Sequence, residues 1–288
     1  MKTAIIVDST SYLPDAMLAH PDIYQINLSV TFDDGQVFED LVTDAFFKDF
    51  YDYLEAHPQT VTTSQPPLGQ YMELMDQLVE KGYERVLAFH LSSSISGTYQ
   101  NARTILEEYQ DRMDTYCYDS KGAAVVVMAL VQKALALLEK GMPMAEIDRL
   151  LRQQIEDCFI YLTVEDLTYL SRGGRLKNGA ALIGNLLHIK PILYFNELGE
   201  IGLLEKVRTQ RRMYHRLAEI AINAMKAHPE GVELYFCHAM AEDVIQDILS
   251  IVEAECGPVD YQVGRIGPVI GAHVGLGSCG MATIPKIS

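Results

Sequence analysis

At 288 residues with 49% hydrophobic side chains, the chain is too long for a minimal domain and can bury a sizeable core. Its formal net charge of −16 makes nucleic acid and anionic membrane surfaces unfavourable partners, because their phosphates would repel it. The first residues show no signal-peptide pattern, and the longest apolar helical stretch, 123–138, is too short to span a bilayer. We therefore expect a soluble, cytoplasmic protein without stable membrane insertion.

The first half of the chain alternates strand-like and helix-like segments. Apolar runs predict strands at 4–7, 24–30, 86–91 and 115–118, and the intervening segments predict helices at 44–56, 68–81, 98–109 and 123–139. This alternation is typical of a parallel sheet whose strands are joined by helices. We expect residues 1–155 to form one α/β domain.

The pattern changes after the amphipathic stretch 144–155, so we place a domain boundary at residue 156. A strand at 159–163 and an apolar stretch at 180–187 open the second unit. Segments 192–195 and 201–207 flank a polar loop containing Gly199 and predict a hairpin. Helices at 209–227 and 242–254, with strands at 232–236 and 261–265, complete a second α/β domain over residues 156–288.

Small polar residues follow several predicted strands, at Asp8 to Ser11, Ser92 to Ser94, and Asp119-Ser120. The carboxyl ends of the strands in an open α/β sheet line the crevice where ligands bind. We expect these groups to gather in one site that is neutral and rich in hydroxyls.

Two hydroxyl-rich motifs precede predicted helices. Thr62-Thr63-Ser64-Gln65-Pro66-Pro67 fits an ordinary helix N-terminus, and the same hydroxyls and free N–H groups also suit an anion. The stretch from Leu91 to Gln100 carries four serines and a glycine, more than a cap needs, which favours an anion-binding turn. It is not a G-x-S-x-G nucleophile elbow, because Ser94 stands two positions before Ser96.

Two glycine-rich motifs lie in the second half. The basic turn Tyr169 to Arg175 is either a solvated turn or a docking or phosphate-contacting site. The stretch Ile266 to Gly280 contains G-x-G-x-x-G, but too few residues follow it for a dinucleotide-binding unit. His273 stands among these glycines, where backbone can approach a ligand closely, which favours a functional role over that of a core histidine.

Together these motifs resemble the DegV family, the fatty-acid-binding proteins that serve bacterial fatty acid kinase. They occur in family order and span nearly the whole chain. The matching segments are Asp8-Ser9-Thr10, Thr63-Ser64-Gln65-Pro66, Leu91-Ser92-Ser93, Ser96-Gly97-Thr98-Tyr99, Gly173-Gly174-Arg175, Gly184-Asn185-Leu186-Leu187, Ile189-Lys190-Pro191, Arg208-Thr209-Gln210 and Gly271-Ala272-His273 with Gly275 and Gly277.

The resemblance implies a Rossmann-like N-terminal domain packed on a second α/β domain, with a long-chain fatty acid between them. It implies that Thr63, Ser96 and His273 hold the carboxylate. Further ligand-site candidates beside them are Ser64, Ser93, Gly97, Gly271 and Ala272. Arg175 and Arg208, together with Arg172, are expected to face the ATP-binding kinase subunit.

The same resemblance implies a lipid-binding subunit rather than an enzyme, with no metal or cofactor of its own. No Walker-type G-x-x-x-x-G-K-[ST] or kinase signature appears, so ATP and Mg are expected to be bound by the partner. The joint product would be an acyl phosphate for phospholipid metabolism.

Two alternatives remain open. A lipid hydrolase or acyltransferase could use Ser96 with His273, but it would need a carboxylate such as Asp8 or Asp119 to orient the histidine, and an oxyanion hole. A sugar- or nucleotide-binding module would instead hold a polar ligand in the crevice.

Overall fold

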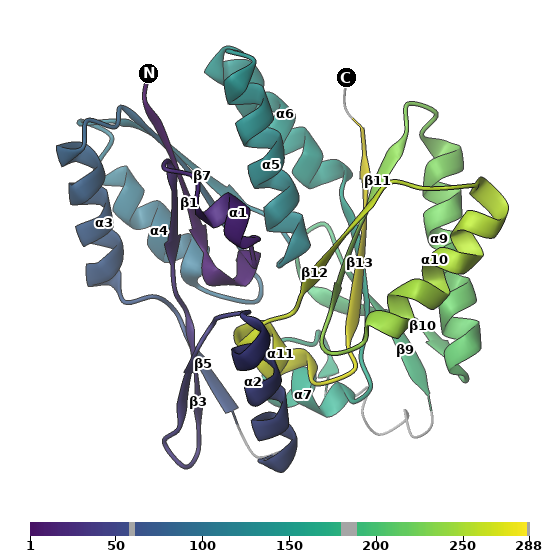
Figure 1. Ribbon diagram of the computed structural model, residues 1–288. Coiled ribbons are helices and arrows are strands. Elements are labelled where there is room, and N and C mark those ends of the chain that lie inside the picture. The colour runs from purple at the N-terminus through teal and green to yellow at the C-terminus, as the bar shows by residue number, and fades with distance from the viewer. Residues whose placement is uncertain (58–60, 180–188, 287–288) are drawn as a thin grey trace.

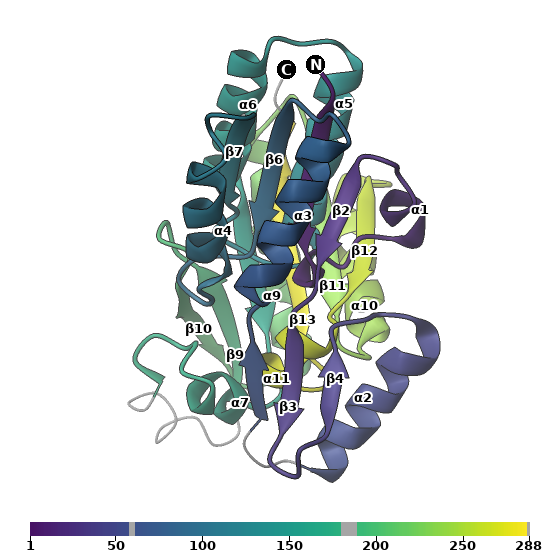
Figure 2. The same ribbon diagram turned by 90° about the vertical axis from the view of Figure 1, so that its left-hand side faces the viewer.

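The computed structural model describes residues 1–57, 61–179 and 189–286 and arranges them as two sheet-containing units side by side (Figure 1). The sheet of the first unit is parallel throughout, with the strand order β2 (Ile23–Ile26), β1 (Thr3–Asp8), β6 (Arg85–His90) and β7 (Asp114–Asp119). Figure 2 shows this sheet behind its covering helices. The predicted parallel α/β arrangement is confirmed.

Helices cover both faces of this sheet, which explains why its strands read as continuous apolar runs. Ala4 and Ile6 point to α3 (Leu68–Glu80) and α4 (Thr98–Glu107), whereas Ile5 and Val7 point to the core shared with α5 (Val125–Glu139). A short 3-10 helix, η1 (Ser9–Ser11), and α1 (Asp15–Leu18) follow β1.

The predicted strand at 24–30 is two strands in different sheets. After β2 the chain leaves the first sheet, and β3 (Ser29–Phe32) pairs with β4 (Val37–Glu39) and β5 (Val61–Ser64) in a small antiparallel sheet beside α2 (Asp44–Ala56). The prediction that 62–64 cap the following helix is therefore wrong. These residues belong to β5, and Pro67 precedes α3 without any side-chain cap.

The sheet of the second unit is mixed, and its first strand in the chain follows α6 (Met144–Asp157). Its strand order is β10 (Ile201–Val207), β9 (Lys190–Phe195), β8 (Phe159–Thr163), β13 (Cys279–Pro285), β11 (Val232–His238) and β12 (Tyr261–Arg265). The predicted 192–207 hairpin is present as β9 and β10. Helices α9 (Gln210–Ala227) and α10 (Glu242–Cys256) cover the outer face, and α5 and α6 lie on the side that faces the first unit (Figure 1).

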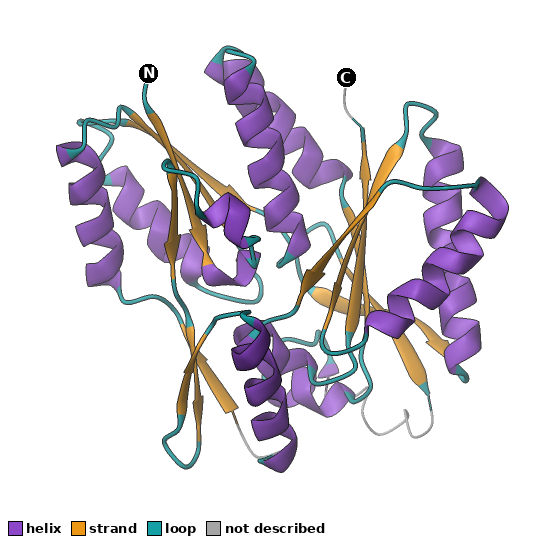
Figure 3. Cartoon of the chain, in the orientation of Figure 1, coloured by secondary structure: helices purple, strands orange, loops and turns teal. Residues whose placement is uncertain are grey.

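Two short helices occupy the space between the units, as the secondary-structure colouring makes clear (Figure 3). They are α7 (Leu167–Arg172) and α11 (Pro268–Val274), which contact each other. The glycine-rich segment was not predicted to be helical, but it forms α11, which packs closely on the first unit. A Cβ on Gly271 would come within 2.5 Å of the Tyr51 hydroxyl. Gly271 thus serves close packing, not the backbone approach to a ligand that the sequence suggested.

The predicted apolar stretch 180–187 and the family motif Gly184-Asn185-Leu186-Leu187 lie outside the described residues. Within the parts of the chain that the structure describes, no helix has the length and apolar character needed to cross a membrane.

Candidate ligand-binding site

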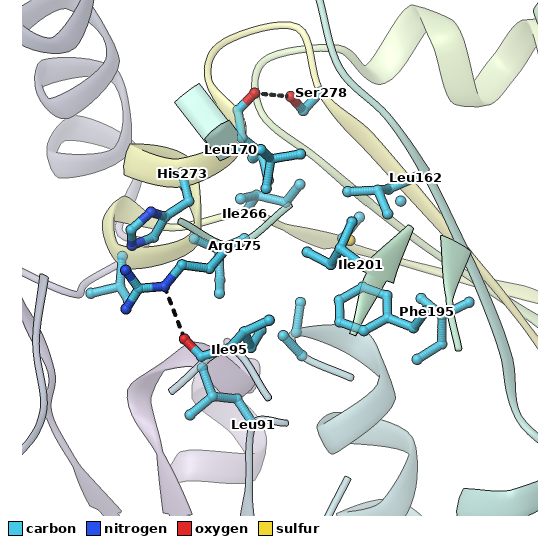
Figure 4. A pocket seen from close by; sticks show the side chains of 18 of the residues that line it. Leu91, Ile95, Leu162, Leu170, Arg175, Phe195, Ile201, Ile266, His273 and Ser278 are labelled. Atoms are coloured by element: carbon cyan, nitrogen blue, oxygen red, sulfur yellow. Dashed lines mark hydrogen bonds between the residues drawn. The ribbon is translucent and has the colours of Figure 1, made fainter. Parts of the chain in front are cut away.

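A narrow cavity lies between the two units and is lined mostly by apolar side chains (Figure 4). Strand ends, α7, α11 and the β8–β9 side of the second sheet all contribute to its wall. The lining residues are Leu28, Thr63, Leu91, Ile95, Ser96, Ala123, Ala124, Ile160, Tyr161, Leu162, Leu170, Arg175, Phe195, Ile201, Cys237, Ile266, Val269, Ile270, His273, Val274, Ser278, Cys279 and Gly280.

Polar side chains gather at one end of this cavity. Thr63 Oγ1, from β5, lies 2.9 Å from His273 Nε2, from α11. Ser96 lies in the loop before α4, where its Oγ accepts a hydrogen bond from the Thr98 N–H at 3.3 Å. The structure thus brings Thr63, Ser96 and His273 to the same cavity.

The environment of His273 favours its neutral form. Burial, reinforced by the positive charge of Arg175, lowers the pKa of His273 to about 4. Its ring packs tightly on the turn after α7, since a Cβ on Gly173 would come within 2.3 Å of His273 Nδ1. At neutral pH the imidazole is therefore an uncharged hydrogen-bonding group, not a cation.

The expectation of a neutral site is wrong, because Arg175 lines the cavity. The sequence predicted an exposed basic turn, but the Arg175 N–H bonds to Leu170 O at 3.0 Å and the side chain turns inward. Its Nε donates to Ile95 O at 3.0 Å, and the guanidinium lies beside His273 (Figure 4). Gly174, with φ of +71°, makes this reversal of the chain possible.

Sequence reasoning missed the residues that hold α11. Gly267 gives this helix no side-chain cap, and the first unit supplies one instead. Asp40 Oδ1 accepts a hydrogen bond from the Val269 N–H at 2.9 Å, and the Tyr12 hydroxyl accepts one from the Ile270 N–H at 3.2 Å. Burial raises the pKa of Asp40 to about 7. A helix start without its own capping residue was the one signal in the sequence for such a partner.

The polar residues at the strand ends do not line the cavity as expected. Asp8 Oδ2 accepts a hydrogen bond from the Leu91 N–H at 3.0 Å and lies 3.1 Å from His90 Nδ1. Ser92 Oγ donates to Gly199 O at 2.9 Å, so it joins the first unit to the β9–β10 turn. These groups satisfy buried backbone and side-chain partners, which is the usual reason for polar atoms in a core.

The further ligand-site candidates do not line the cavity. Ser64, Ser93, Gly97, Gly271 and Ala272 are not among the described residues that line the cavity. Ser64 is exposed on β5, and the Ser93 N–H donates to Asp119 Oδ1 at 3.1 Å. Ala272 is buried in α11.

The geometry does not support a hydrolase. No described carboxylate makes a hydrogen bond to His273, since Asp8 is paired with His90, and Asp119 accepts from the backbone of Ser93 and Lys121. Ser96 bonds to Thr98 instead of His273. No group of His, Cys, Asp and Glu in the described ranges could hold a metal ion.

Two of the predicted docking arginines lie outside the cavity. Arg172 is exposed at the end of α7, and Arg208 is exposed between β10 and α9. Neither is among the described lining residues.

Comparison with known proteins finds similarity along nearly the whole chain. The sequence model of the DegV family, described as an uncharacterised protein, matches residues 2–286. A DegV domain-containing protein of Streptococcus pyogenes serotype M1 is 33% identical over 287 residues, which cover 100% of each chain.

Solved structures show the same architecture. A crystal structure described as a fatty acid binding DegV family protein from Streptococcus agalactiae has a TM-score of 0.92 and 34% identity, with 100% of each chain covered. The structure of DegV from Bacillus subtilis, described as a fatty acid binding protein, has a TM-score of 0.84 and 33% identity over 99% of this chain and 100% of that one. The chain therefore belongs to the DegV family.

Proposed function

We propose that this protein binds a long-chain fatty acid with its acyl tail in the cavity between the two units. The observation that carries the proposal is a cavity lined mostly by apolar residues, with hydroxyl, imidazole and guanidinium groups gathered at one end. The relatives described as fatty acid binding support it. A sugar or nucleotide would leave its polar groups unpaired against such a wall.

The apolar wall is sufficient to supply the affinity. Burying about fifteen methylenes at roughly 0.8 kcal/mol each gives about 12 kcal/mol of gross driving force. The polar end then needs only to orient the head group.

The carboxylate would lie at Thr63, Ser96 and His273. A hydroxyl donor and a neutral imidazole N–H can each bond to one carboxylate oxygen, and the positive charge of Arg175 would offset the buried negative charge. Because Arg175 Nε and one of its terminal nitrogens already bond to Ile95 O and Gly173 O, the guanidinium is held in place before the ligand arrives.

We further propose that the bound acid is presented to a separate ATP-binding kinase subunit. A carboxylate oxygen would attack the γ-phosphorus of ATP, ADP would leave, and the acyl phosphate would form, with ATP and Mg held by the partner. Arg208 supports this proposal, because it is exposed and stands with Arg211 and Arg212 on a chain of net charge −16. Arg172 adds a further exposed positive charge.

The test of the first step is identification of the ligand. Protein purified from bacteria is denatured, and the released molecules are extracted and analysed by mass spectrometry. We expect one fatty acid per chain, and we expect added fatty acid to raise the melting temperature of the stripped protein. A protein that carries no lipid and gains no stability from fatty acids would contradict the proposal.

The second step is tested with the kinase subunit and ATP. Ser96→Ala, Thr63→Val and His273→Ala should each lower acyl phosphate formation more than fatty acid binding, since each removes about 1 to 3 kcal/mol at the head group. Equal losses in both measurements would argue against presentation.

A further inference from the structure

The cavity and a hollow on the protein surface share part of their lining. Ile160 of β8 and Phe195 of β9 line the cavity and also line the neighbouring surface hollow. The hollow, here called the outer hollow, is open to solvent. Its other lining residues are Ser120, Lys121, Ile155, Glu156, Cys158, Phe159, Tyr194, Asn196, Glu197 and Leu198. The two side chains therefore form a wall between the apolar cavity and the outer hollow.

This wall stands at the end of the cavity away from the polar groups. Figure 4 shows Phe195 on the opposite side of the lumen from His273 and Arg175. A chain that starts at His273 and extends through the lumen would meet Phe195 with its methyl end.

Neighbouring contacts hold the Ile160 side chain and the backbone next to Phe195. A Cβ on Gly122 would come within 2.4 Å of Ile160 Cδ1, so the backbone of this turn packs directly on Ile160. Phe195 ends β9 at a tight turn, in which the Asn196 N–H bonds to Glu200 O at 3.0 Å. Ser92 Oγ holds the turn to the first unit by its bond to Gly199 O at 2.9 Å.

Part of the outer hollow is apolar, although Lys121, Glu156 and Glu197 also line it. Phe159 and Leu198 are 54% and 65% exposed and line the hollow, so they leave apolar surface there. Phe195 and Ile160 stand between this surface and the cavity.

We propose that Phe195, backed by Ile160, sets the longest acyl chain that the protein accepts. This inference rests on the proposed fatty acid binding. In the wild-type protein each methylene up to the wall adds affinity, and further methylenes must bend or displace the ring. In Phe195→Ala the additional methylenes pass into the outer hollow and bind its apolar surface.

The experiment measures dissociation constants for saturated fatty acids from lauric to behenic acid. Wild-type affinity should rise and then fall along the series. In Phe195→Ala the acid with the lowest dissociation constant should be longer than in the wild type. Affinity should gain about fourfold for each methylene that passes the wall. In Phe195→Trp the larger ring thickens the wall, so the acid that binds most tightly should be shorter than in the wild type.

Leu170→Ala is the matched control, because Leu170 lines the cavity near His273 and does not border the outer hollow (Figure 4). It should weaken binding of all the acids alike without moving the best length. A wild-type length preference that Phe195→Ala and Phe195→Trp leave unchanged would overturn the inference and leave the proposed function standing. A wild-type protein that binds no acid of the series would overturn both.

Discussion

Asp40 Oδ1 accepts a hydrogen bond at 2.9 Å from the backbone N–H of Val269, 229 positions further along the chain. The carboxyl group of one unit thereby caps the helix of the other unit that carries His273. Ser9 Oγ donates to Asp40 Oδ2 at 2.8 Å, so the cap is itself anchored at the end of β1. The position of His273 relative to Thr63 depends on this contact between the units.

Asp40→Ala should lower the free energy of unfolding by about 1 to 3 kcal/mol, because it removes a helix cap and leaves buried donors unpaired. Asp40→Asn keeps an acceptor for the Val269 N–H and should cost less. Thermal or denaturant unfolding measures both, with Asp33→Ala, exposed in the turn between β3 and β4, as the control. If Asp40→Ala were as stable as Asp33→Ala, the Asp40 cap would contribute nothing to the stability of the protein.

The His273 pKa predicts a pH dependence of stability. In the unfolded chain its pKa is about 6.5, and burial lowers it to about 4 in the folded protein. Between these values the unfolded state binds the proton and the folded state does not, so the free energy of unfolding falls as the pH falls. The loss approaches about 3 kcal/mol and is absent above pH ~6.5.

His273→Gln removes this titration. The difference in stability between wild type and variant should therefore change between about pH 6.5 and 4 and stay constant above that window. The raised pKa of Asp40 gives a slope of opposite sign, which cancels in the difference because both proteins retain Asp40. A difference that is flat across the window would show that His273 titrates normally.

Gly199 and Gly35 form a matched pair. Both have positive φ, +73° and +86°, but a Cβ on Gly35 meets nothing within 4 Å, whereas one on Gly199 would come within 2.2 Å of Ser92 Oγ and 3.1 Å of Lys121 Cα. Gly35→Ala should cost only the backbone penalty of about 1 to 2 kcal/mol. Gly199→Ala should cost about 1 to 3 kcal/mol more, through overpacking against the first unit.

Chemical denaturation of the two variants tests this comparison. Adding Ser92→Ala to Gly199→Ala should recover part of the loss, since the nearest clashing atom is then absent. Equal costs for Gly35→Ala and Gly199→Ala would mean that the β9–β10 turn does not press on the first unit.

Arg175→Ala and Arg208→Ala should separate ligand binding from partner recognition. Arg175 lines the cavity, so its loss should weaken fatty acid binding by about tenfold or more, whereas Arg208 is exposed and its loss should leave binding unchanged. With the kinase subunit, Arg208→Ala should lower acyl phosphate formation most at low salt, where charge attraction is strongest.

Fluorescent fatty acid displacement and a phosphorylation assay over a salt series provide the two measurements. Unchanged fatty acid binding by Arg175→Ala would return this residue to the docking role that the sequence suggested. Wild-type phosphorylation by Arg208→Ala at all salt concentrations would remove the basis for docking there.

The sequence predicted those parts of the fold that follow from local pattern. Continuous apolar runs identified β1, β6 and β7 as strands of a parallel sheet, and the Gly199 loop identified the β9–β10 hairpin. It did not reveal β13, whose sequence CGMATIP lacks the alternation of a surface strand because both faces are covered. It also did not reveal α11, because its glycine, which permits close packing, is unfavourable in a helix and does not indicate one.

The candidate site was only partly predictable, because some of its residues are placed by contacts between distant parts of the sequence. Thr63, Ser96 and His273 stand in motifs that resemble a known family, and the structure brings them to one cavity. Their role with a carboxylate stays a prediction. Arg175 and Asp40 depend on contacts across more than 70 residues, Arg175 with Ile95 and Asp40 with Val269, and no local pattern encodes such contacts.

The central position of β13 bears on the order of events during synthesis. Residues 279–285 lie between β8 and β11 and pair antiparallel with both, so β8 must await a partner that emerges 120 positions later, from 159 to 279. Until then the edge of β8 that pairs with β13 has free backbone N–H and C=O groups, which can pair with non-native strands. Cys279 and Gly280 also belong to the cavity wall, so a nascent chain has no closed compartment for a lipid until β13 is inserted. In the proposed function, ligand capture would therefore follow the insertion of β13, and a folding chaperone would meet the chain while this cavity is still incomplete.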